Sequence, residues 1–167
     1  AADSPTVFKG TSGLSASPTR FDNEYYTIDF DATHGGMTRL LDKHLGVEMI
    51  TPGQIGNELF SLENPSASSK DKPVTIELVE QGPWRATLRV RSVIGEAPYE
   101  NLISLYAGLK RIDCDLTVDY GKAGLNFGEK NKPDTGLLVR FPLNFSGKLH
   151  VNQPFGIYET KKDHQVS

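Results

Sequence analysis

The sequence predicts an all-β fold, an antiparallel β-sandwich of about ten strands. Apolar residues recur at every second position in several runs, the period of a strand with one buried face. Valine, isoleucine and threonine together number 30 against 9 alanines, a balance that favours strands. The 16 glycines and 10 prolines supply turns, and no window of about a dozen residues keeps the 3.6-residue period of a helix.

The 167 residues suit one domain with its own core. Residues 1–20 are small and polar, so we expect a linker or an arm along a sheet edge, followed by a β-sandwich domain over 21–167. The opening Ala1-Ala2-Asp3 has neither the basic nor the apolar region of a signal peptide. It is compatible with a processed secreted chain or an excised piece, so the compartment stays open, with a secreted or periplasmic location slightly favoured.

The first four expected strands cover 26–30, 37–41, 45–50 and 58–62. In the first, apolar side chains alternate with Thr27 and Asp29, and the glycine pair at 35–36 then turns the chain into the second. The serine- and proline-rich stretch 63–72 reads as a surface loop.

The remaining expected strands cover 74–78, 84–90, 99–107, 110–120, 136–145 and 149–158. Trp84 is in phase with the apolar positions of its run, which predicts a core tryptophan, while arginines occupy the opposite phase. Gly108-Leu109 is a short link typical of a hairpin. The glycine-rich segment 121–135 is long enough for a loop with a function.

The charge and hydropathy of the chain exclude two classes of partner. The net charge is −3 and the longest basic run is Lys161-Lys162, so we expect no nucleic acid partner. No run of about 18 apolar residues is present, so we expect no membrane span.

Nothing in the sequence predicts a metal or cofactor in this chain. The only cysteine, Cys114, is in phase with apolar positions and reads as a small buried residue whose thiol pKa the flanking aspartates raise. The four histidines show no ligand spacing. A nucleophile elbow, a phosphate loop and a dinucleotide-binding motif are also lacking.

Carboxylates on one strand offer the first candidate chemistry. Asp113, Asp115 and Asp119 share one phase, and neighbours two apart lie roughly 6.5–7 Å from each other. That distance fits a glycosidase pair, for which about 6.5–9.5 Å is one of the two usual separations. It also fits a solvated strand face that answers Arg85, Arg89 and Arg91 two strands away, and we interpret the pattern first in this second way.

A sugar-binding face is the second candidate. Guanidinium and carboxylate groups take paired hydrogen bonds from vicinal hydroxyls, and a tyrosine at the rim can stack on a sugar ring. If the chain binds carbohydrate, we expect the site to comprise Arg85, Arg89, Tyr99, Asp113 and Asp115.

Several segments together resemble the C-terminal β domain of glycoside hydrolase family 38, the α-mannosidases. In order they are NEYYTIDFD (23–31), GGM (35–37), LLDK (40–43), GNEL (56–59), EQGPWRA (80–86), ISLYAG (103–108), RID (111–113), FPLN (141–144) and PFGI (154–157). The chain departs from the family at Tyr158-Glu159-Thr160, where an arginine is usual.

The resemblance implies a galactose-mutarotase-like supersandwich that lies downstream of the catalytic machinery. In such mannosidases the zinc ion and the carboxylate nucleophile belong to an N-terminal domain, so no catalytic or metal residue carries over to this chain. The chain ends at Ser167, before a full supersandwich is complete, so we expect either an excised piece or a shortened, free-standing module.

Three functions remain open. The first is a non-catalytic accessory domain of an α-mannosidase-like glycoside hydrolase. Its expected partners are the catalytic domain of the same parent chain and a carbohydrate, for example a mannose-containing glycan. The second is a free-standing carbohydrate-binding module. The third is a self-sufficient glycosidase that uses Asp113 and a neighbour. An exposed apolar patch favours the first, and a groove with aromatic, arginine and aspartate side chains favours the second.

Overall fold

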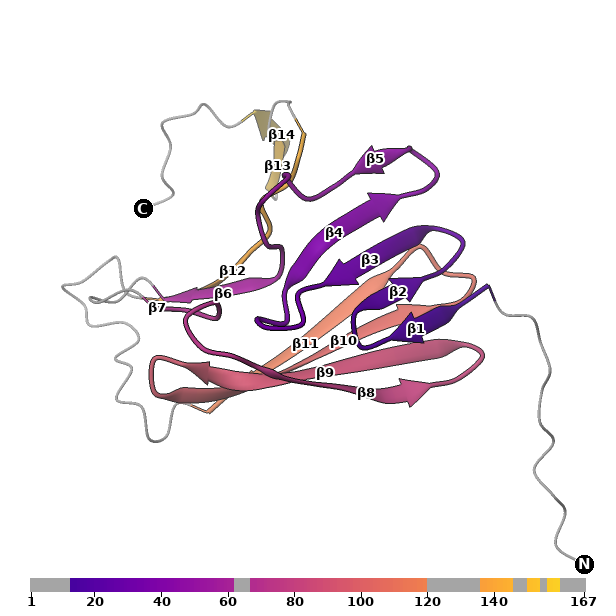
Figure 1. Ribbon diagram of the computed structural model, residues 1–167. Coiled ribbons are helices and arrows are strands. Elements are labelled where there is room, and N and C mark those ends of the chain that lie inside the picture. The colour runs from indigo at the N-terminus through magenta and orange to yellow at the C-terminus, as the bar shows by residue number, and fades with distance from the viewer. Residues whose placement is uncertain (1–12, 62–66, 120–135, 146–149, 154–155, 160–167) are drawn as a thin grey trace, which may run out of the picture.

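The predicted all-β antiparallel sandwich is confirmed. The computed structural model describes residues 13–61, 67–119, 136–145, 150–153 and 156–159, and these contain fourteen strands and no helix. All the strand pairs are antiparallel. Two sheets lie one above the other, the N-terminal strands over β8 to β11 (Figure 1). In the part of the chain described, no helix could span a membrane.

The first layer is a five-stranded sheet in which sequence neighbours pair, in the order β1-β2-β3-β4-β5. Its strands are β1 (Ser15–Ser17), β2 (Arg20–Asp22), β3 (Tyr26–Phe30), β4 (Met37–Asp42) and β5 (Val47–Glu48). β1 lies at the sheet edge within the residues expected to form an arm. The division at residue 20 stays a prediction.

The second layer is a four-stranded meander in the order β11-β10-β9-β8. Its strands are β8 (Thr75–Gln81), β9 (Arg85–Ile94), β10 (Ala97–Tyr106) and β11 (Ile112–Val118). β9 and β10 are ten residues each and form the centre of the sheet. The turn at Gly95 and the link at Gly108 both need a positive φ, +59° and +74°, which glycine adopts without strain.

Two smaller sheets complete the described chain. A three-stranded sheet, in the order β12-β6-β7, consists of β6 (Glu58–Ser61), β7 (Ala67–Ser68) and β12 (Leu137–Arg140). A hairpin of β13 (His150–Gln153) and β14 (Gly156–Glu159) lies where one strand was expected. β7 lies within the predicted loop 63–72, and the predicted loop 121–135 is outside the described residues.

The core lies between the two layers. One face of β9 and β10 and the facing sides of β2, β3 and β4 bury their apolar side chains in one cluster, because strand side chains alternate between faces. The cluster consists of Phe21, Ile28, Phe30, Met37, Leu59, Ala86, Leu88, Val90, Ile94, Ala97, Tyr99, Ile103 and Leu105. Phe21 and Phe30 meet edge to face at 5.3 Å between ring centroids, a favourable geometry for two rings.

Two turns of the first sheet fasten the layers together. In the β2–β3 turn the buried Asn23 amide donates to the carbonyl of Tyr106 at 2.7 Å, and Glu24 accepts from the backbone N–H of Gly108 at 2.5 Å. In the β3–β4 turn, the carbonyl of Thr33 accepts from Val74 at 3.0 Å. The hydrogen bonds thus join each of these turns to the second sheet.

Two expected core residues are exposed, which corrects the sequence interpretation. Trp84 is 66% exposed because β9 starts one residue later, so the alternation of the strand does not extend to it. Cys114 has the inward phase, but β11 is the edge strand of its sheet and the residue is exposed. Protein atoms still crowd its sulfur, and this desolvation, followed by the charges of Asp113 and Asp115, raises the pKa of the thiol to about 11.

We predict that Gly35→Ala lowers the free energy of unfolding by about 2–4 kcal/mol, measured by urea denaturation. The φ of Gly35 is +73°, and a Cβ there would collide with Cγ1 of Val90 across the core. Gly95→Ala is the matched control, since its φ is +59° and nothing lies within 4 Å of an added Cβ. Equal losses in the two variants would mean that the contact with Val90 carries no energetic weight.

Candidate functional site

The outer face of the four-stranded sheet carries four of the five residues predicted to bind sugar. Arg85 and Arg89 alternate with the buried positions of β9. The register places Asp115 in one row with Leu102 and Arg89, and Asp113 in the next row with Ser104 and Thr87. Because directly paired residues point to the same side of a sheet, these four side chains share the outer face.

Neighbouring side chains already pair with most of these charges. Arg85 contacts Glu80 at 2.7 Å, and Arg89 contacts Glu77 at 3.2 Å. Asp113 accepts from Arg111 at 2.6 Å and from the Tyr106 hydroxyl at 2.7 Å. The face is therefore a charge ladder, but its arginines pair with glutamates and Asp113 pairs with Arg111, whereas the sequence interpretation paired the aspartates with the arginines of β9.

The pKa shifts on this face have the same cause. Hydrogen bonds from Arg111 and then Tyr106 hold the pKa of Asp113 below its ordinary value of 3.8. The hydrogen bond to Asp113 raises the pKa of Tyr106, and the one to Glu80 raises the pKa of Arg85. Each shift strengthens the charge state found near neutral pH, so the geometry gives none of these groups the character of a general acid or base.

The fifth predicted residue, Tyr99, does not lie at the rim of the outer face. It has the phase of Asn101 and Ile103, belongs to the core cluster and is 5% exposed. Burial raises the pKa of its hydroxyl, which bonds to Ser92. The sequence interpretation placed Tyr99 at a strand start, whereas β10 begins at Ala97 and has already left the turn there.

A pocket of about 300 Å³ lies near Tyr99, where β9, β10 and β11 run side by side. Its lining comprises Arg91, Ser92, Pro98, Tyr99, Glu100, Thr117 and Asp119. Arg91, Glu100 and Thr117 form one row across the three strands. Sequence reasoning placed Arg91 on the outer face but missed Glu100, because the register that pairs the two residues depends on the hairpin at Gly95.

A buried carboxylate organises the three-stranded sheet. Glu58 is 1% exposed, and its side chain accepts from Ser68 at 2.6 Å and contacts Lys70 at 3.1 Å and Arg140 at 2.5 Å. Burial alone would raise the pKa of Glu58, but the hydrogen bonds from Ser68, Arg140 and Lys70 outweigh it and hold the pKa below its ordinary value. Arg140 also lies over the Phe60 ring at 5.5 Å. Glu58 thus ties β6 to β7 and β12.

The profile of one protein family, described as "Glycosyl hydrolases family 38 C-terminal domain", matches residues 21–167. The match covers far more than half of the 167 residues. The chain belongs to this family. The resemblance found in the sequence is thereby confirmed. None of the curated proteins compared with the chain matches it.

Two segments of the resemblance have clear structural roles in this family 38 domain. The GNEL segment at 56–59 supplies the buried Glu58 and the left-handed residue Asn57, whose φ is +58°. The segment at 23–31 supplies Asn23, which fastens the two layers. Both segments thus contribute to folding.

The described part of the family 38 domain shows no group of three side chains that could hold a metal ion. His34 contacts Asp31 at 3.3 Å, as an isolated pair. Burial alone would raise the pKa of Asp31, but hydrogen bonds from the Thr33 and His34 backbone outweigh it and lower the pKa. The absence of a metal or cofactor from the whole chain stays a prediction.

We predict that Trp84→Ala changes the free energy of unfolding by less than about 0.5 kcal/mol, because the side chain is 66% exposed. Tyr99→Ala should cost about 3–5 kcal/mol, because it truncates a core aromatic residue. Thermal melting of both variants provides the comparison. A large loss of stability in Trp84→Ala would contradict the exposed position and show that this tryptophan belongs to the core, as the alternation of the sequence predicted.

We predict that Glu58→Gln lowers the free energy of unfolding near neutral pH by about 1.5–3 kcal/mol, the range for a hydrogen bond to a charged group. The folded pKa of Glu58 lies below its ordinary 4.5, so the unfolded chain takes up the proton first as the pH falls. The carboxylate therefore stabilises the fold above pH 4.5, and this contribution is lost as the pH falls through the folded pKa.

Urea denaturation at several pH values checks this prediction. The dependence on pH below 4.5 should be shallower in Glu58→Gln than in the wild type. Glu48→Gln is the control, since Glu48 is 40% exposed in its surface pair with Arg39 and should matter by less than about 1 kcal/mol. An unchanged pH profile in Glu58→Gln would show that this carboxylate does not contribute to acid sensitivity.

Proposed function

We propose that this domain is a non-catalytic accessory domain of an α-mannosidase-like glycoside hydrolase, and that it supports carbohydrate processing by packing against the catalytic domain of the same parent protein. Membership in a family of C-terminal domains supports a role beside other parts of a glycosyl hydrolase. The observation that carries the proposal is an apolar segment at the edge of the fold.

That segment, residues 138–145, exposes five large apolar side chains within eight positions. They are Leu138 at 49%, Val139 at 45%, Phe141 at 40%, Leu143 at 43% and Phe145 at 65% exposed. Leu138 and Val139 alternate along β12, so that strand exposes an apolar side chain on each of its faces. β12 is also the terminal strand of its sheet in the described chain. An apolar concentration of this kind marks an interaction surface.

Partner chemistry follows from the composition of the segment. Its exposed large side chains are leucine, valine and phenylalanine, so the complementary surface is apolar, as in the buried core of a protein–protein interface. A sugar ring stacks on aromatic side chains such as Phe141 and Phe145, but its hydroxyl groups offer no large apolar surface to Leu138, Val139 and Leu143. The segment therefore favours a protein domain over a carbohydrate as its occupant.

We expect the double variant Leu138→Lys/Phe145→Lys to weaken association with a family 38 catalytic domain from the same source by at least about a hundredfold. Burying a Leu or Phe side chain contributes about 1.5–3 kcal/mol, and a buried lysine reverses the sign of that contribution. Sedimentation of the mixed domains measures the affinity. Leu45→Lys is the control, because Leu45 is 65% exposed in the β4–β5 turn, outside the segment.

Two results would contradict the proposal. One is the absence of any association with the catalytic domain. The other is an equal loss of association in Leu45→Lys, which would show that the charge added and not the site is responsible.

The second candidate function is a carbohydrate-binding module. The outer face as predicted gives it limited support, because its arginines pair with glutamates of the same sheet and Tyr99 is buried. The pocket beside Arg91 supports it better, since it provides the concave surface that a small ligand needs.

A further inference from the structure

We propose that the pocket between β9, β10 and β11 is a secondary sugar subsite, which takes one neutral pyranose unit through two adjacent hydroxyls. The choice of a sugar rests on the proposed role in carbohydrate processing. The pocket and its donor and acceptor groups rest on the geometry alone. The groups that hydrogen-bond to the two hydroxyls are Arg91 and Glu100. They lie in the row of the sheet next to the predicted residues Arg89 and Asp115.

The hydrogen-bonding groups match two neighbouring hydroxyls. Arg91 donates through Nε at 2.7 Å and approaches through Nη2 at 2.6 Å, in both cases to Oε2 of Glu100. This arrangement fixes both side chains and engages only one oxygen of the carboxylate. These contacts use neither Oε1 of Glu100 nor Nη1 of Arg91, so the pair keeps a further acceptor and a further donor. Two vicinal hydroxyls, one donating and one accepting, satisfy both.

The charges around the pocket favour a neutral ligand. The lining contains one guanidinium, that of Arg91, and two carboxylates, those of Glu100 and Asp119. Arg89 brings a second guanidinium to 3.4 Å from Oε2 of Glu100. Arg91 pairs with Glu100, and Arg89 is shared between Glu100 and Glu77, so this row offers no uncompensated positive charge to an anion such as phosphate. A polyhydroxylated neutral molecule suits the site better.

The other lining residues fit a sugar ring. Pro98 is exposed and offers an apolar ring to the C–H face of a pyranose. Thr117 is exposed in the same row as Glu100 and adds a hydroxyl. A volume of about 300 Å³ has room for a single pyranose, at the lower limit of small-molecule sites. The strands beneath hold Arg91 and Glu100 at fixed positions.

The test is a titration of the full 167-residue chain with methyl α-D-mannopyranoside, followed by NMR chemical shifts. Saturable binding should shift the backbone signals of residues 91, 100 and 117. Glu100→Gln and Arg91→Met should each weaken it about tenfold or more, the loss of a hydrogen bond to a charged group. Arg85→Met is the matched control, because Arg85 lies on the same face in an equivalent pair with Glu80 but does not line the pocket.

Thr117→Val keeps the test decisive if either of the charge variants fails to fold, because it removes only an exposed hydroxyl and should weaken binding severalfold. Inorganic phosphate serves as the charged probe and should not compete. The proposal is overturned if the glycoside does not bind saturably, if phosphate binds in its place, or if Arg85→Met weakens binding as much as the pocket variants do. The association test with Leu138→Lys/Phe145→Lys does not involve the pocket, so either proposal can fail while the other stands.

Discussion

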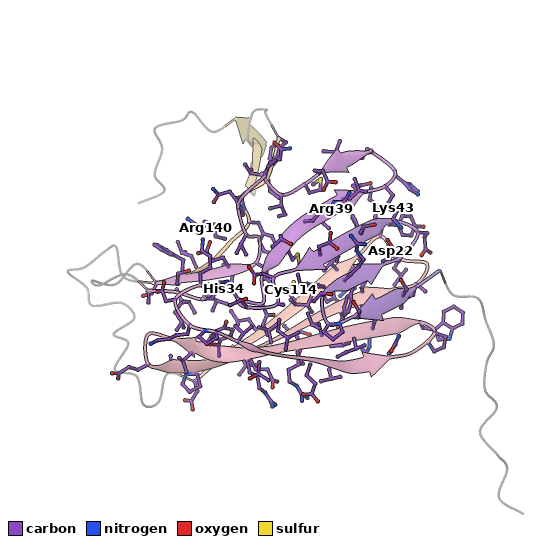
Figure 2. All side chains as sticks on the ribbon, in the orientation of Figure 1. Asp22, His34, Arg39, Lys43, Cys114 and Arg140 are labelled. Carbon is purple, nitrogen blue, oxygen red and sulfur yellow. The ribbon has the colours of Figure 1, made fainter. Side chains whose placement is uncertain are left out.

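The burial of one face of the β9–β10 hairpin is the constraint on which the rest of the described structure depends. These two strands supply eight of the thirteen buried residues in the core cluster. They are long enough for the alternation to repeat five times, and each is paired on both sides. Because every second residue must face the core, the remaining residues form a polar outer surface whose composition is determined at the same time. Figure 2 shows the labelled charged side chains Asp22, Arg39 and Lys43 on the upper layer, away from this hairpin.

The register of the second sheet then decides what its outer face can do. The tight turn at Gly95 sets Arg91 opposite Glu100 and Arg89 opposite Leu102. Most charges on the face are consequently neutralised by a neighbour, as in an ordinary wet sheet. Beside Pro98 the surface is concave enough to hold a small molecule.

The edges of the fold behave differently from its centre. β11 and β12 are terminal strands of their sheets in the described chain, and both expose side chains that would be buried in a central strand. Cys114 on β11 and the segment 138–145 are examples. Two types of surface, a polar sheet face and an apolar edge, therefore fit the two types of partner proposed for a family 38 C-terminal domain, a sugar and a protein domain.

The sequence by itself determined the fold class, most of the strands and the family, because a period of two and the order of short motifs are local properties that need no knowledge of contacts. It also determined which residues of β9 and β11 share a face, since alternation settles that within each strand. Tertiary structure alone decided where a strand begins, which strand lies at an edge and which residues stand opposite each other. Trp84 is exposed and Tyr99 is buried because their strands begin at other residues than the sequence indicated. Cys114 is exposed because its strand lies at the edge of a sheet. The pairing of Arg91 with Glu100 and the burial of Glu58 among Ser68, Lys70 and Arg140 join residues distant in the chain, and such contacts leave no periodic trace in the sequence.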